Sequence, residues 1–194
     1  ISWMCRGEVI DLILPLDGAW RFSLAGGPER ILQVPGAWEA ETGDHLTEGP
    51  AVYTREVEFG PEWLGRVWLE VDAASFAVEV FFNGTRAGGH RGMWSPFQVE
   101  LTDQVRPGVN VLRLEVWKPG KRFSMREALA GFLPDVCTTF GGLWQSVRLR
   151  GAAQASVGLH DVVWSVAQDG SVQVSAAVLD DVPPEAQVEL AVGQ

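Results

Sequence analysis

Cysteine and histidine are scarce in this 194-residue chain, which has two cysteines, Cys5 and Cys137, and three histidines. Two cysteines with no C-x-x-C spacing exclude a disulfide framework, so we expect free thiols. His45, His90 and His160 also lack a metal-ligand spacing such as H-E-x-x-H. A P-loop and a G-x-S-x-G nucleophile motif are missing as well. We therefore expect no metal and no other cofactor.

The chain also lacks an excess of positive charge and any long apolar run. Lysine and arginine number 15 against 25 acidic residues, a net charge of −10, which argues against duplex nucleic acid and anionic membranes as partners. No apolar run approaches the ~20 residues of a membrane span. The short run VIDLIL (9–14) lacks the basic flank and cleavage site of a signal peptide. The expected location is the cytoplasm.

Turn residues and period-two patterns are abundant instead. The chain has 22 Gly and 11 Pro, and its apolar residues alternate with polar ones in short runs between turns. Asn83-Gly84 is a strong hairpin signal. Such short strands between turns predict an antiparallel sandwich, jelly roll or barrel. Strands are expected at 52–59, 66–71, 75–82, 85–87, 97–101, 109–117 and 143–149. The expected core comprises Trp20, Phe22, Val78, Val80, Phe82, Phe97, Leu112, Leu114 and Val147.

Two segments interrupt this pattern. SMREALA (124–130) is a good helix former, with Ser124 and Glu127 at a capping-box spacing, and predicts a short helix. After residue 154 the strand pattern restarts, with expected strands at 162–166, 172–178 and 188–192. About 40 residues cannot bury a core alone, so they are expected to be the first strands of a second sandwich. The predicted domains are therefore residues 1–154 and 155–194.

Eight short motifs follow one another along residues 12–150. They are LDGAWRF (16–22), VPGAW (34–38), YTREVEF (53–59), VFFNGT (80–85), GGHRG (88–92), SPF (95–97), NVLRLEV (110–116) and GGLWQSVRL (141–149). In this order they resemble the N-terminal domain of glycoside hydrolase family 2, the family of β-galactosidases, β-glucuronidases and β-mannosidases. The resemblance implies an all-β chain: a galactose-binding-like jelly-roll β-sandwich with a short helix, followed by a truncated immunoglobulin-like sandwich.

The same resemblance implies that the catalytic machinery lies elsewhere. Retaining glycosidases use two carboxylates on either side of the scissile bond. Family 2 carries its acid/base Glu in an Asn-Glu pair on a TIM barrel, which takes about 250 residues. The two asparagines here, Asn83 and Asn110, are followed by Gly and Val. We therefore expect no catalytic residue in this chain and a missing catalytic barrel as its partner.

The stretch DVCTTFGG (135–142) is the candidate substrate-binding loop. In family 2, the loop before the last strand of the first domain reaches the mouth of the barrel, and its Asp contacts sugar hydroxyls. The resemblance makes Asp135 that residue, with Thr138, Thr139, Phe140 and Trp144 beside it. Asp135 stands seven residues before Gly142, whereas better-known members have six and Val136 occupies that place here. The alternative is that Asp135 only forms a turn after Pro134.

His90 and the overall role leave further alternatives open. His90 lies between Gly88-Gly89 and Gly92, so it is either a substrate contact or a structural hydrogen-bonding residue in a tight bend. The chain is expected to be the non-catalytic N-terminal region of a family 2 glycosidase that acts on β-glycosides. The alternatives are a free-standing carbohydrate-binding module and a structural domain without ligand. Family 2 sandwiches also form subunit contacts, which leaves a homo-oligomer open.

Overall fold

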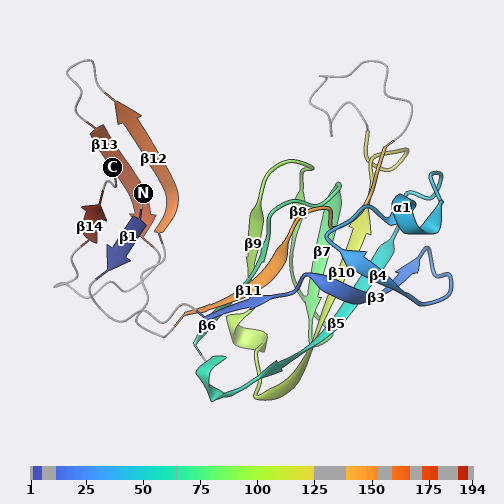
Figure 1. Cartoon of the computed structure of the whole chain (residues 1–194), viewed down its shortest axis with the longest axis horizontal. Coiled ribbons are helices and arrows are strands. Elements are labelled where there is room, and N and C mark those ends of the chain that lie inside the picture. Colours follow the sequence, from blue (N-terminus) through green and yellow to red (C-terminus); the bar gives the residue numbers. More distant parts are fainter. Residues whose placement is uncertain are drawn as a thin grey trace. The chain divides into compact units, whose positions relative to one another are not determined.

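The computed structural model of the chain describes residues 2–5, 12–63, 65–124, 139–152, 159–166, 172–178 and 188–191. The chain forms two compact units (Figure 1). The larger unit is residues 11–151, and the smaller one joins residues 1–10 to residues 152–194. Each unit is built from β-strands, which confirms the predicted all-β class.

The described residues of the larger unit form a sandwich of two sheets with three short helical turns. The turns are α1 (Trp38–Thr42), η1 (Pro61–Trp63) and η2 (Thr102–Gln104). The six-stranded antiparallel sheet has the order β4-β3-β5-β10-β7-β8 and comprises β3 (Gly18–Leu24), β4 (Arg30–Val34), β5 (Ala51–Phe59), β7 (Ala77–Phe82), β8 (Thr85–Arg91) and β10 (Gly108–Trp117). The four-stranded sheet has the order β2-β11-β6-β9 and comprises β2 (Leu12–Pro15), β6 (Arg66–Val71), β9 (Phe97–Glu100) and β11 (Val147–Ala152).

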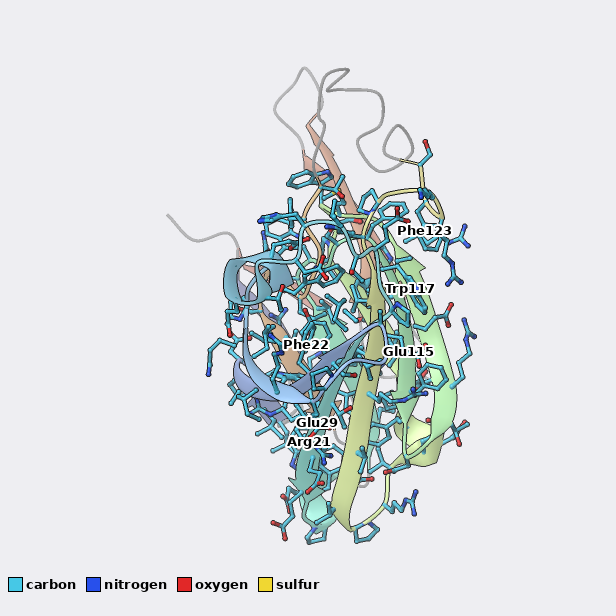
Figure 2. All side chains as sticks on the ribbon, turned by 90° about the vertical axis from the view of Figure 1, so that its right-hand side faces the viewer. Arg21, Phe22, Glu29, Glu115, Trp117 and Phe123 are labelled. Atoms are coloured by element: carbon cyan, nitrogen blue, oxygen red, sulfur yellow. The ribbon has the colours of Figure 1, made fainter. Side chains whose placement is uncertain are left out.

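The core lies between these two sheets, because alternate side chains of each strand point to the same face. In β3, Phe22 is buried, while Arg21 and, nearby, Glu29 stay at the outside (Figure 2). Eight of the nine predicted core residues are buried, and the ninth, Phe97, is half-buried and packs against them. The predicted hydrophobic pattern is therefore confirmed.

Asn83-Gly84 forms the hairpin turn predicted between β7 and β8, with φ values of 50° and 81°. Both values lie in the left-handed region, as a two-residue hairpin turn requires. The Asn83 amide group donates to the carbonyl of Gln104 and to Oδ1 of Asn110, both at 2.8 Å. This amide nitrogen is already engaged in the fold, which gives Asn83 a structural role in the turn.

One predicted strand was partly wrong. The alternation of residues 143–149 predicted a strand from Leu143, but β11 begins at Val147. Residues 142–146 instead cross between the sheets: the Leu143 carbonyl accepts from Gly36 N–H and the Gln145 N–H donates to Ala73. The predicted helix over 124–130 lies outside the described residues, apart from Ser124.

The described residues of the smaller unit form two strand pairs. β12 (Leu159–Val166) pairs antiparallel with β13 (Val172–Val178), as the sequence predicted. β1 (Ser2–Cys5) pairs antiparallel with β14 (Val188–Ala191), so the start of the chain joins this unit. An immunoglobulin-like domain from residue 155 stays a prediction. Within the described segments, none of the helices has the length and apolar character needed to cross a membrane.

Truncation of Phe82 tests the sandwich core directly. Phe82 is fully buried, so Phe82→Ala should lower the free energy of unfolding by about 3–5 kcal/mol. The control is Val109→Ala, because Val109 is 61% exposed and its loss should change stability by less than about 0.5 kcal/mol. Urea unfolding followed by tryptophan fluorescence measures both. Equal losses would contradict the register of β7 and β10.

Candidate functional site

A buried ion pair lies where α1 meets the end of β10. Lys118 Nζ is 2.7 Å from Glu39 Oε1, and the two side chains are 2% and 6% exposed. Glu39 stands in the first turn of α1, and Lys118 directly follows the last residue of β10. Their burial matters because a charge away from water needs both an opposite charge and further hydrogen bonds.

Those further partners come from residues 139–141 and from the chain just after α1. The backbone N–H of Gly141 donates to both carboxylate oxygens of Glu39 at 3.1 Å. The Lys118 ammonium donates to the carbonyls of His45 at 2.9 Å and Thr139 at 3.4 Å. The ion pair therefore joins α1, the end of β10 and residues 139–141 at one point.

Gly141 and Gly142 allow this close approach. A Cβ at Gly141 would lie 2.1 Å from the Trp38 ring, and one at Gly142 would lie 2.5 Å from the Gly36 carbonyl oxygen. Gly142 also has a φ of 135°, which L side chains rarely adopt. From there the chain pairs with Ser75 through two backbone hydrogen bonds. The two glycines are thus required for packing.

Three aromatic side chains gather next to this point and form the aromatic trio: Trp94, Phe140 and Trp144. Each pair is edge-to-face, with ring centroids 5.5 to 6.4 Å apart. Trp144 Nε1 donates to the Met93 carbonyl at 3.0 Å, and Ser75 Oγ donates to the Phe140 carbonyl at 2.6 Å. Trp94 is 60% exposed. A flat, exposed indole beside polar groups can cover the apolar C–H face of a sugar.

The structure brings together part of the predicted site. Phe140 and Trp144 are in contact, as members of the trio. Thr139 lies beside them in the chain, with its hydroxyl donating to the Pro119 carbonyl at 2.8 Å, so it holds two backbone segments together. Asp135 and Thr138 lie outside the described residues. Their role as sugar contacts stays a prediction.

His90 has a different environment from the trio. Its ring stacks on Phe97, with centroids 4.4 Å apart and planes at 10°, and Ser95 Oγ lies 3.5 Å from Nε2. Burial lowers the pKa of His90 below its ordinary value. This shift favours the neutral imidazole, which packs as a flat ring against Phe97. This geometry fits a structural role, and a sugar contact by His90 stays a prediction.

Three residues of this site were missed by the sequence analysis: Trp94, Glu39 and Lys118. Trp94 had a signal, because a large aromatic residue among Gly92, Ser95 and Pro96 stands in a turn and not in a strand. No sequence signal marked the ion pair, since its two residues are 79 positions apart in the chain. Across the described ranges, no three His, Cys, Asp or Glu side chains come together as metal ligands would.

Comparison with known proteins identifies relatives of this chain. No family model matches the chain. The chain is 28% identical to a curated β-glucuronidase of Bacteroides fragilis over 147 residues, which is 72% of this chain and 20% of that protein. The structure superposes on an FMN-binding β-glucuronidase from Faecalibacterium prausnitzii with a TM-score of 0.66 and 25% identity, covering 88% of this chain and 28% of that one.

The resemblance to glycoside hydrolase family 2 is confirmed. A family 2 β-galacturonidase from Eisenbergiella tayi, solved with bound galacturonate, shares the fold with a TM-score of 0.67 at 23% identity. The match covers 95% of this chain and 38% of the galacturonidase. The chain therefore spans about a fifth to two fifths of the family 2 proteins that it matches, so the activity of the whole protein is a proposal.

Breaking the ion pair should be costly. Glu39→Gln or Lys118→Met leaves one buried charge without its partner, so each should lower the free energy of unfolding by about 3–5 kcal/mol. The double variant should lose less than the sum of the two, because no unpaired charge remains. Urea unfolding of the three variants measures these effects.

The control is the exposed pair of Arg21 and Glu56, with atoms 3.3 Å apart and side chains 44% and 60% exposed. Arg21→Gln should cost less than about 1 kcal/mol. Single variants at Glu39 and Lys118 that are as stable as Arg21→Gln would contradict a structural role for the buried pair.

Proposed function

We propose that this chain is the non-catalytic N-terminal region of a family 2 glycosidase. In the full-length form, a barrel would hydrolyse β-glycosides with retention, and this region would shape the sugar subsite. The observation that carries the proposal is the exposed Trp94 packed against Phe140 of the predicted substrate loop. The relatives named above also support the proposal, because they are glycosidases of this family.

The proposed contribution of each part follows from its chemistry. Asp135 would accept hydrogen bonds from sugar hydroxyls, since a carboxylate offers two acceptor oxygens. The trio would cover the sugar's C–H face. The ion pair of Glu39 and Lys118 would hold residues 139–141, and with them Phe140, in a fixed position. The acid/base and nucleophile carboxylates would come from the barrel.

A free-standing carbohydrate-binding module is the second candidate, favoured by the exposure of Trp94. A module of this kind would bind sugar without a barrel. At the subsite of Asp135 and the trio, we expect the 194-residue chain to bind free sugar weakly or not at all, because one carboxylate and a few rings offer little against the cost of ordering ligand and loop. The proposal also includes a cytoplasmic location and leaves subunit contacts to be measured.

The reading frame beyond the codon for Gln194 is the first test. A barrel with an Asn-Glu pair encoded there would support the glycosidase. A stop codon in that place would contradict it and favour the module. β-Glucuronides and β-galacturonides are the first substrates to assay with the full-length protein, because the relatives named above are β-glucuronidases and a β-galacturonidase.

Asp135→Ala in the full-length enzyme tests the subsite. Lost hydroxyl contacts should lower kcat/KM by roughly tenfold or more and leave the melting temperature nearly unchanged. Thermal melts and steady-state kinetics measure the two effects. The control is Asp103→Ala. Asp103 lies in η2, which precedes β10, so it stands at the end of that strand opposite to Lys118. A destabilised Asp135→Ala protein with unchanged kcat/KM would show that Asp135 only forms a turn.

A further inference from the structure

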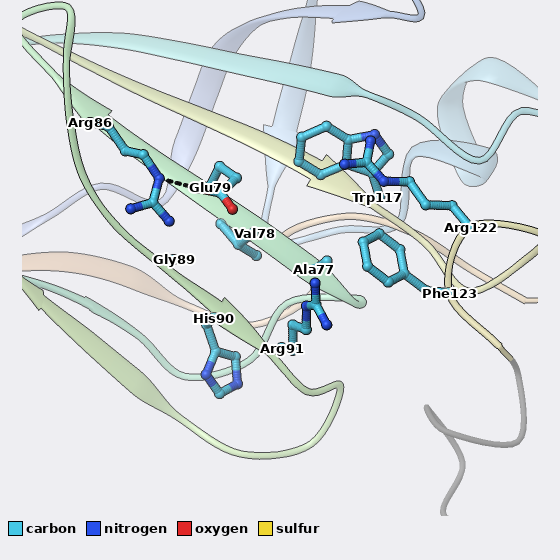
Figure 3. A pocket seen from close by; sticks show the side chains of 10 residues that line it. All are labelled: Ala77, Val78, Glu79, Arg86, Gly89, His90, Arg91, Trp117, Arg122 and Phe123. Carbon is cyan, nitrogen blue, oxygen red and sulfur yellow. Dashed lines mark hydrogen bonds and ion pairs between the residues drawn. The ribbon is translucent and has the colours of Figure 1, made fainter.

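A hollow of about 320 Å³ lies on the outer face of the six-stranded sheet, over β7 and β8 (Figure 3). This volume is within the range of sites for small ligands. Small residues, Ala77 and Gly89, lie beneath it. Trp117 and Phe123 stand on one side of the hollow, and Arg86 with Glu79 on the other. These side chains are a separate set from the aromatic trio.

The hollow carries an excess of positive charge. Three arginines line it, Arg86, Arg91 and Arg122, against one carboxylate, Glu79. Arg86 Nε and Glu79 Oε2 are 2.5 Å apart, so these two charges offset each other. In the part of the chain that the structure describes, no carboxylate pairs with the guanidinium group of Arg91 or of Arg122. Two guanidinium groups without a carboxylate partner among the described residues thus line one hollow, in a chain with a net charge of −10.

The guanidinium groups of Arg91 and Arg122 both lie against aromatic rings. Arg122 lies 4.5 Å from the centre of the Trp117 ring and 5.3 Å from that of Phe123, and Arg91 lies 5.2 Å from the Phe123 ring. Trp117 and Phe123 are themselves buried in a small cluster with Phe76 and Met93. A ring against one face of a guanidinium fixes its plane, while the N–H groups at its edge stay free to donate.

Fixed guanidinium edges are the donors that suit a planar or tetrahedral oxyanion. Arginine donates two parallel hydrogen bonds to a carboxylate, sulfate or phosphate, and these bonds are stronger than neutral ones. We propose that Arg91 and Arg122 make this hollow a binding site for an oxyanion, either the carboxylate of an acidic sugar or an inorganic anion. The site needs no barrel, so it does not depend on the proposed glycosidase function.

Titration of the ¹⁵N-labelled 194-residue chain tests this site. Sodium glucuronate, sodium sulfate and uncharged glucose are added in turn at constant ionic strength, because exposed charges are screened by salt. We expect saturable shifts of the Trp117 indole N–H and the Gly89 amide with glucuronate or sulfate, and none with glucose. Tighter binding of glucuronate would identify a sugar acid as the ligand, and equal binding would identify a site for the oxyanion alone.

Arg91→Gln and Arg122→Gln should each weaken that binding about fivefold or more, since each removes one charged donor. The control is Arg21→Gln in the same sheet, whose guanidinium pairs with Glu56 and whose loss should leave the affinity unchanged. Melting temperatures of all three variants check that they fold. The proposal is overturned if neither anion shifts these signals, or if both variants bind as tightly as the unchanged chain.

Discussion

The buried ion pair of Glu39 and Lys118 is the interaction on which the candidate site depends. Two charges away from water stabilise a fold only when each also finds hydrogen-bond partners. Here Gly141 supplies the backbone N–H for Glu39, and the carbonyls of His45 and Thr139 accept from Lys118. The ion pair therefore fixes three segments to one another: the helix α1, Lys118 directly after β10, and residues 139–141.

The position of the aromatic trio follows from this constraint. Phe140 lies between Thr139 and Gly141, both of which bond to the ion pair. Its carbonyl accepts from Ser75, so the backbone at Phe140 is held from two sides. Trp94 can then pack edge-to-face against a ring whose backbone is anchored, while most of its own surface stays exposed. A rigid base and an exposed indole are what a sugar subsite requires.

Much of the fold could be predicted from the sequence, because alternation with period two places Phe82 and Leu114 in the core whatever their distant neighbours are. The start of β11 could not be predicted. Leu143 fits the alternating pattern of a strand, but its carbonyl accepts a hydrogen bond from the Gly36 N–H outside β11. Phe140 and Trp144 came from the family resemblance. The ion pair that positions them is formed by tertiary contacts alone, and no local pattern marks it.

Hydrogen exchange at the Gly141 amide tests the dependence of the site on the ion pair most directly. In the unchanged chain this N–H donates to Glu39 and is buried, so it should exchange slowly. In Glu39→Gln we expect its exchange to be at least roughly tenfold faster, relative to that of Leu114 in the middle of β10, because residues 139–141 open locally. An unchanged ratio of the Gly141 and Leu114 rates would show that the ion pair does not hold the site.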